Sequence, residues 1–311
     1  MSKPLRSSRF RKAEKMKKYE NSMRRYKRER GLLIFSFLLL PMILLSLFVV
    51  YPVITMIVYS FTDWNGYGVS ASFVGLKNYI KIFTDTKYWS VFGNSAYYLA
   101  AGLLQQLMSL MLASLFMKPK KGMGFFKGSI FFPYLINTVA VTFIFLMFYE
   151  KGGTLDAILN FFGLEGLSRL WIADPVVVKF SLAFTSIWKN LGYSFLIYLG
   201  AMNSVSSEIY EAAEIDGAGS AAKIRYITLP NIKMVIGLML MMTIVGSLTV
   251  FEIPFIMTKA QNGTNTFLST IVDVAFTYNQ FGLASALSIV LLILITVIVI
   301  IQKVILKEEA V

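Results

Sequence analysis

The chain contains no histidine and no cysteine among its 311 residues. This composition removes imidazole bases, thiolate nucleophiles, disulfides, iron–sulfur clusters and ordinary zinc sites from the available chemistry. A glycine-containing segment, residues 122–129, lacks the G-x-x-x-x-G-K-[ST] spacing of a phosphate-binding loop. We therefore predict that the chain is not an enzyme and holds no metal or cofactor of its own.

Polar and aromatic side chains interrupt otherwise apolar segments, and these are the candidates for contact with a solute. They are Gln106, Asn137, Lys189, Asn190, Tyr193 and Glu252, with Gln105 and Thr138 beside them. If these apolar segments cross a membrane, polar groups within them are costly to bury in the hydrocarbon and are usually functional. Carboxylate, amide and hydroxyl groups next to rings would suit a sugar. The alternative is that they join helices to one another, with Lys189 and Glu252 as a structural ion pair.

A second candidate is the polar segment of residues 203–231, which separates two apolar stretches. Ser206 or Ser207 can cap a helix here. Gly217 and Gly219 should break that helix, and a second helix over 220–229 should stop at Pro230. The predicted helix–glycine–helix elbow, with small residues at its apex, suits docking against another protein. A solvated connector is the alternative, while acidic residues argue against a helix lying on anionic lipid.

The elements that must position these residues are membrane helices. Apolar residues make up 56% of the chain and charged residues 15%, with a mean hydropathy of +0.65; soluble domains average about 45–50% and about 25%. An all-α integral membrane fold is predicted, because each crossing needs about 20 apolar residues. The six expected spans are 32–61, 92–117, 126–149, 176–202, 232–257 and 283–306.

Lysine and arginine set the expected orientation. Residues 1–30 hold 13 of them against three glutamates. With the N-terminus inside, 22 lie on the cytoplasmic side and 6 in the outer loops, so both termini are predicted to be cytoplasmic. Residues 1–30 form a basic tail, expected beside anionic lipid rather than nucleic acid, and 31–311 form the transmembrane domain. The outer loops 62–91 and 150–175 are long enough for short helices.

The elbow resembles a known motif. Glu211-Ala-Ala, then Gly217, Ile227 and Leu229-Pro230, stand at the spacing of the EAA loop of ABC importer permeases. Residues 60–65 and 73–79 resemble the first outer loop of the carbohydrate-uptake subgroup. So do residues 132–134, 188–189 and 282–286 elsewhere in the chain. Residues 257–263 lack that subgroup's usual Gly-Gly-Pro turn, although Asn262 and Gly263 can still supply a turn.

The resemblance implies a permease subunit of a bacterial cell-membrane importer for carbohydrates. Its implied partners are a second homologous permease, two copies of an ABC ATPase that binds ATP and Mg²⁺, and an extracellular or periplasmic solute-binding protein. The residues it assigns to coupling with the ATPase are Glu211, Ala212, Ala213, Asp216, Gly217, Leu229 and Pro230. Three alternatives stay open: an ion-coupled secondary transporter, a membrane scaffold or insertase, and a permease for a polyol or glycerol phosphate.

Overall fold

The computed structural model describes residues 5–68, 71–117 and 121–308. These ranges are helical apart from loops and one isolated β-bridge between Thr62 and Phe73. The chain divides into two compact units, residues 1–58 and 59–311. The fold class predicted from the sequence, an all-helical chain, is confirmed for the described residues.

The first unit is a run of helix that joins the basic tail to the first apolar segment. Helix α1 covers Leu5–Leu45, a π-helical turn, η1, covers Ser46–Val50, and α2 covers Tyr51–Ser60. The helix passes through Gly31 without a break, although the sequence suggested a boundary there. The 40-residue stretch Asn21–Ser60 is apolar enough to cross a membrane, and its most apolar 18 residues include none that is buried.

The second unit is a helical bundle whose centre is formed by α4 (Thr86–Leu115), α8 (Val177–Asn203) and α12 (Lys233–Thr249). Glycines allow two close approaches in it. A Cβ at Gly192 of α8 would stand 2.0 Å from the carbonyl oxygen of Ile130, and one at Gly102 of α4 would stand 2.5 Å from a methyl of Thr243. The α8 backbone can therefore pack directly against α5 (Met123–Leu135).

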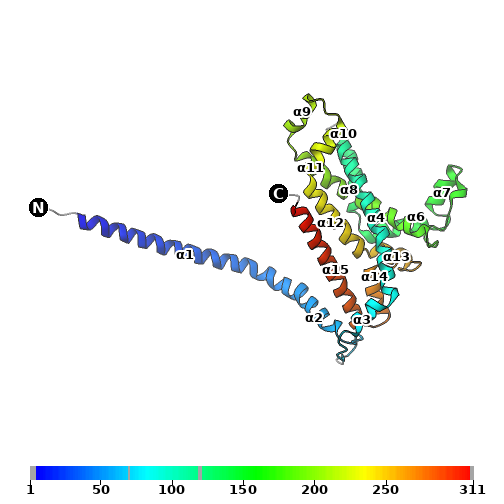
Figure 1. The fold of residues 1–311 in the computed structure, drawn as a ribbon, viewed down its shortest axis with the longest axis horizontal. Coiled ribbons are helices and arrows are strands. Elements are labelled where there is room, and N and C mark those ends of the chain that lie inside the picture. The colour runs from blue at the N-terminus through cyan, green and yellow to red at the C-terminus, as the bar shows by residue number, and fades with distance from the viewer. Residues whose placement is uncertain (1–4, 69–70, 118–120, 309–311) are drawn as a thin grey trace. The chain divides into compact units, whose positions relative to one another are not determined.

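One end of the bundle carries several short helices (Figure 1). These are α3 (Lys77–Thr84), α14 (Phe267–Val272) and the π-helical turn η4 (Asp273–Thr277), which leads to the last long helix, α15 (Phe281–Glu308). Val91, Ala286 and Leu287 are buried in the apolar cluster that joins α4 to α15. The predicted turn before α14 is confirmed, because Asn262 and Gly263 both have positive φ.

A small lobe follows α6 (Thr138–Tyr149) and contains α7 (Thr154–Phe161) and a 3-10 turn, η2 (Glu165–Leu167). Its centre is the buried carboxylate of Asp156. This carboxylate accepts hydrogen bonds from Trp171 Nε1 (2.9 Å), the Gly152 amide (2.8 Å) and the Ser168 hydroxyl (2.8 Å). These donors, led by Trp171, hold the pKa of Asp156 below its ordinary value. The loops 62–91 and 150–175 thus both contain short helices, as predicted.

The elbow lies at the opposite end of the bundle, where α15 also ends (Figure 1). It comprises α9 (Ser207–Ile215), α10 (Ser220–Lys223), a π-helical turn, η3 (Ile224–Thr228), and α11 (Leu229–Asn231). Ser206 caps α9 and Gly217 has φ of +78°, both in line with the predicted break. The predicted stop at Pro230 is wrong: helix continues to Asn231 and ends at Ile232, because Pro at the start of a helical turn loses no hydrogen bond.

The six predicted spans differ from the observed helices in two places. The third is two helices, α5 and α6, bent by 95°. The fifth breaks at Val250 and Phe251 before α13 (Glu252–Thr258). Within the described residues, four helices are long and apolar enough to cross a membrane, or five if the bent pair counts as one span. Helix α8 has 27 residues but is less apolar, because one of its faces is polar.

Candidate functional site

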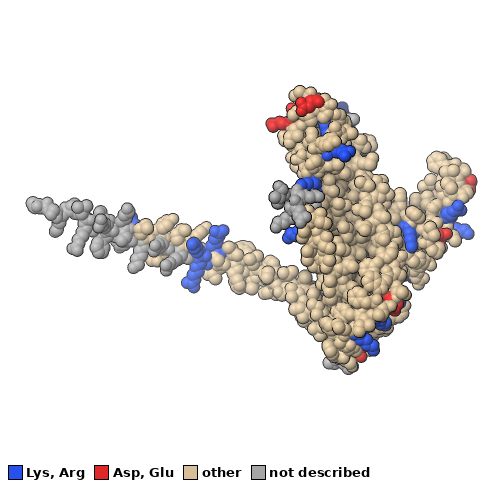
Figure 2. Space-filling model, in the orientation of Figure 1, with Lys and Arg blue, Asp and Glu red and all other residues tan. Residues whose placement is uncertain are grey.

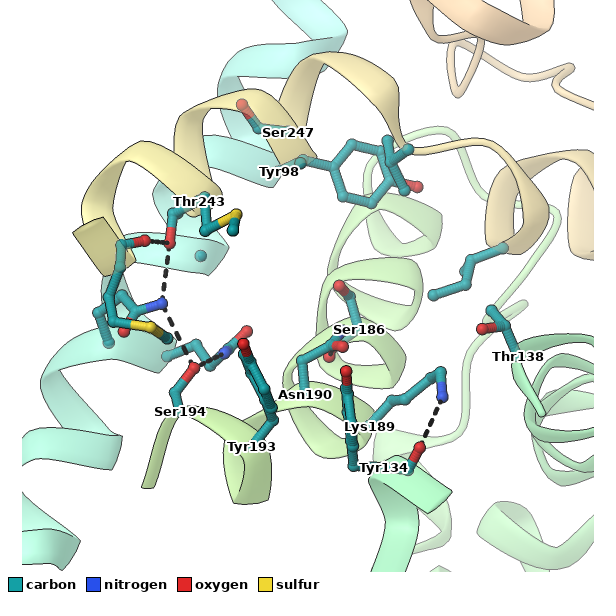
Figure 3. A pocket seen from close by; sticks show the side chains of 18 of the residues that line it. Tyr98, Tyr134, Thr138, Ser186, Lys189, Asn190, Tyr193, Ser194, Thr243 and Ser247 are labelled. Atoms are coloured by element: carbon teal, nitrogen blue, oxygen red, sulfur yellow. Dashed lines mark hydrogen bonds between the residues drawn. The ribbon is translucent and has the colours of Figure 1, made fainter. Parts of the chain in front are cut away.

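A cavity of about 330 Å³ lies between the middle parts of α4, α8 and α12. Five of the six residues that the sequence suggested for contact with a solute line this cavity: Gln106, Lys189, Asn190, Tyr193 and Glu252. Figure 3 shows side chains of α8, including Asn190 and Ser186, facing Thr243 and Ser247 of α12 across this space. The volume falls in the usual range for small-molecule sites, about 300–1,000 Å³.

The cavity wall on the α4 side is held by a polar cluster that joins three helices. Gln105 Nε2 donates to Ser194 Oγ at 2.9 Å, and Gln106 Nε2 donates to Thr243 Oγ1 at 2.8 Å. Both glutamines are buried. Gln106 therefore has both of the roles that the sequence left open: it joins α4 to α12, and it lines the cavity. Ser194 and Thr243 provide the matching oxygens.

The break between α5 and α6 forms another part of the wall. Lys189 Nζ donates to the carbonyl oxygens of Ile136 (2.8 Å) and Tyr134 (3.4 Å), where the turn after Pro133 ends α5. A cation is favourable at a helix C-terminus, where carbonyl groups lack helical partners. The lysine therefore stabilises the bend while its stem faces the cavity.

The suggested ion pair between Lys189 and Glu252 is not formed. The lysine is engaged by the α5 carbonyls, and the exposed Glu252 has no ion-pair partner among the described residues. Since Glu252 lines the cavity at the start of α13, its carboxylate is free to accept hydrogen bonds from a solute.

Asn137 was predicted to face the solute path, and the structure corrects this. Its side chain accepts a hydrogen bond from the Val139 amide at 2.9 Å and caps α6. It does not line the cavity, whereas its neighbour Thr138 does. An asparagine before a helix is a strong capping residue, but nothing in the hydropathy pattern predicts a helix start in the middle of a span.

Aromatic rings complete the cavity. The Tyr134 and Tyr193 rings stack with centroids 4.7 Å apart, and Tyr98 lines the cavity from α4. Sequence reasoning missed Tyr98 and Tyr134, together with the small hydroxyl residues Ser186, Ser194, Thr243 and Ser247. Small hydroxyl residues are common in membrane helices, so only their position on the faces of α8 and α12 distinguishes these four.

The elbow presents its predicted residues to solvent. Glu211, Ala212, Asp216, Gly217 and Pro230 are exposed, while Ala213 and Leu229 are half-buried. Figure 2 shows acidic side chains gathered on this outermost part of the bundle. Ile215, at the C-terminus of α9, is 87% exposed. Sequence reasoning did not single out this apolar side chain, whose exposure depends on the break at Gly217.

Residues 105–308, which include both the cavity and the elbow, match the model of the family described as "Binding-protein-dependent transport system inner membrane component". The chain belongs to this family. Two curated relatives resemble this family member over most of its length. The probable ABC transporter permease protein YurN of Bacillus subtilis is 31% identical over 82% of this chain and 90% of the relative. The multiple sugar-binding transport system permease protein MsmF of Streptococcus mutans is 30% identical over 86% and 92%.

The fold of this inner membrane component also matches solved structures. A crystal structure of a bacterial ABC transporter involved in the import of the acidic polysaccharide alginate aligns with a TM-score of 0.79 and 21% identity, covering 90% of this chain and 96% of that one. A second structure, of a bacterial alginate ABC transporter in complex with an alginate pentasaccharide-bound periplasmic protein, gives 0.77 and 21%, covering 88% and 93%. At this identity the likeness concerns the fold alone.

Proposed function

We propose that this chain is the transmembrane permease subunit of an ATP-driven carbohydrate importer in a bacterial cell membrane. The observation that carries the proposal is the exposed elbow with Glu211-Ala-Ala and Gly217 at one end of the bundle, joined through α12 to a polar cavity. A transporter driven by an ion gradient would have no use for such an elbow. Membership of a binding-protein-dependent family and the name of the relative MsmF support import of sugars.

In this proposal the elbow docks on a separate ABC ATPase. The exposed carboxylates of Glu211 and Asp216 offer partners to basic groups or amide donors on that subunit. The small residues Ala212, Ala213 and Gly217 permit close approach, and Ile215 supplies an apolar anchor. ATP and Mg²⁺ bind to two copies of the ATPase, so the permease subunit itself needs no cofactor.

The membrane arrangement follows from the charge distribution. The chain crosses the membrane six times with both termini in the cytoplasm, and α8 is the span that carries the polar cavity face. The elbow between α8 and α12 then lies on the cytoplasmic side. The lobes around α3 and α7 lie outside, where an extracellular or periplasmic solute-binding protein docks.

The cavity is one half of the translocation path, and a second homologous permease supplies the other half. Free acceptor groups such as the Glu252 carboxylate, and stacked rings such as Tyr134 and Tyr193, suit the hydroxyl groups and C–H faces of a sugar. Transport proceeds by alternating access: ATP and the loaded binding protein favour the outward-open state, and hydrolysis restores the inward-open one.

Reconstitution of the complete complex in proteoliposomes tests this function. Labelled glucose, maltose and raffinose are offered with the binding protein, and uptake and ATP hydrolysis are measured together. We expect at least one sugar to be taken up and to stimulate ATP hydrolysis. Uptake driven by an ion gradient without ATP would favour a secondary transporter. If only polyols or glycerol phosphate stimulate ATP hydrolysis, the transported solute is one of these and not a sugar. A complex that moves no solute would indicate a scaffold or insertase.

A further inference from the structure

The two arms of the elbow are tied together by polar contacts between α9 and the segment that leads to α12. On the tip side, Lys223 Nζ pairs with a carboxylate oxygen of Glu214 at 3.2 Å. Nearer the membrane, the hydroxyl groups of Tyr210 and Thr228 are 2.9 Å apart. Movement of α9 is therefore opposed by two links to the second arm.

The Thr228 hydroxyl group has two polar neighbours. In its 2.9 Å contact with the Tyr210 hydroxyl group either oxygen can be the donor. Thr228 Oγ1 also lies 3.3 Å from the Lys223 carbonyl oxygen, across the π-helical turn, and can donate to it. Thr228 therefore stands between the Tyr210 hydroxyl group of α9 and a backbone carbonyl of the second arm.

The two links differ in burial. The side chain of Glu214 is 65% exposed, and exposed ion pairs contribute little because water and salt screen them. Thr228 is fully buried, at 0% exposed. A hydrogen bond to a buried hydroxyl group is shielded from water, so the Tyr210–Thr228 bond resists separation more than the exposed ion pair does.

The second arm is in turn continuous with the cavity wall. The Ile232 amide donates to the Thr228 carbonyl oxygen at 3.1 Å, across the point where α11 meets α12. Ile232 is buried and packs in the cluster that contains Phe195 and Tyr198 of α8. Helix α12 then carries Thr243, which binds Gln106 at the cavity.

We propose that Tyr210 and Thr228 are positioning residues that transmit movement of α9 to α12 and thus to the cavity. The inference rests on the proposed function but assigns these two residues no part in docking. Their hydroxyl groups face each other inside the elbow rather than the surface that an ATPase would contact. Breaking this hydrogen bond should leave the ATPase bound to the permease but lower the amount of solute transported per ATP hydrolysed.

The test uses the complete complex in proteoliposomes, with whichever of glucose, maltose and raffinose stimulates ATP hydrolysis by the parental complex. Solute transported per ATP is measured for Tyr210→Phe, Thr228→Val and the double variant. Thr228→Ser keeps the hydroxyl group. Tyr226→Phe is the matched control, because Tyr226 lies in the same π-helical turn but is 71% exposed.

We expect each hydroxyl-deleting variant to lower solute transported per ATP about fivefold, the effect of one net hydrogen bond on an equilibrium. The double variant should be no worse than either single one, because both remove the same bond. Thr228→Ser and Tyr226→Phe should match the parental complex. The ATPase should co-purify with every variant.

Two results would overturn the inference and leave the importer assignment in place. One is that the Tyr210→Phe and Thr228→Val complexes both transport as much solute per ATP as the parental complex. The other is loss of the ATPase from these variants, which would place both residues in the docking surface. Failure of the proposed function is distinguishable, since the parental complex would then respond to none of the three sugars.

Discussion

Lys189 explains how a positive charge is accommodated among membrane helices. Its ammonium group lies at the carbonyl end of α5 and donates to two oxygens that the bend leaves without helical partners. The charge and the broken helix therefore stabilise each other. A lysine within an apolar segment stands out in the sequence as a residue with a role. The sequence does not show which carbonyl groups it will contact.

Replacing this lysine should destabilise the bend. In Lys189→Met the stem is kept but the donors are lost, so the Ile136 and Tyr134 carbonyls remain unsatisfied. We expect a loss of about 1–3 kcal/mol in the free energy of unfolding, measured by thermal unfolding in detergent. Lys179→Met, near the start of α8, is the control. Unfolding of Lys189→Met at the parental temperature would contradict this role.

Asn137 and Asn190 should separate into two phenotypes. Asn137→Ala removes the α6 cap and should cost about 1 kcal/mol of stability while uptake per folded complex is retained. Asn190→Leu changes the cavity wall and should lower uptake about tenfold with the complex intact, as expected for one lost polar contact in a site. Uptake assays on purified complexes test both. Equal uptake in Asn190→Leu and the parental complex would exclude Asn190 from the path.

At the scale of elements, hydropathy predicted where long helices lie, while their breaks required the structure. The observed α4, α8 and α15 lie within a few residues of the predicted spans 92–117, 176–202 and 283–306. The bend at Ile136 depends on an interaction with Lys189, more than 50 residues away, which periodicity cannot detect. Helix α14 is short and apolar, and the predicted spans leave its residues in the loop between the fifth and sixth spans.

Close contact between α5 and α8 should not tolerate a side chain at Gly192. In Gly192→Ala the new Cβ meets the Ile130 carbonyl oxygen, so the helices must separate. We expect a destabilisation of about 1–3 kcal/mol by thermal unfolding. Gly200→Ala in the same helix meets nothing within 4 Å and should be neutral or slightly stabilising. Equal stability of the two variants would show that α5 and α8 do not pack this closely.

The α7 lobe should open only in acid. Because hydrogen bonds lower the pKa of Asp156 below its ordinary 3.8, its charge stabilises the lobe above that pH and the contribution is lost as pH falls below it. Fluorescence of Trp171, with the other three tryptophans replaced by phenylalanine, should change below about pH 3.8 and not between pH 5 and 8. In Asp156→Asn this acid transition should be absent. A transition near neutral pH would contradict the assignment.

At the scale of the whole molecule, the sequence identified the elbow and most of the cavity without showing how they are joined. Glu211-Ala-Ala and Gly217 stand at fixed spacing, so they could be recognised directly. The cavity needed the helices to be packed, because Ser194 and Thr243 are ordinary membrane residues until they face Gln105 and Gln106. In the structure, helix α12 connects the end of the elbow to the cavity wall.

In the proposed function, the elbow docks on a separate ATPase. The chain has no cysteine, so a single one can be introduced at Ile215, which is 87% exposed at the elbow tip. Phe161→Cys, at an 84% exposed position in the α7 lobe, is the control. In the assembled complex, a cysteine crosslinker should join Ile215→Cys to the ATPase subunit and leave Phe161→Cys unattached to it. Crosslinks from Ile215→Cys that reach only lipid or this same chain would contradict the account.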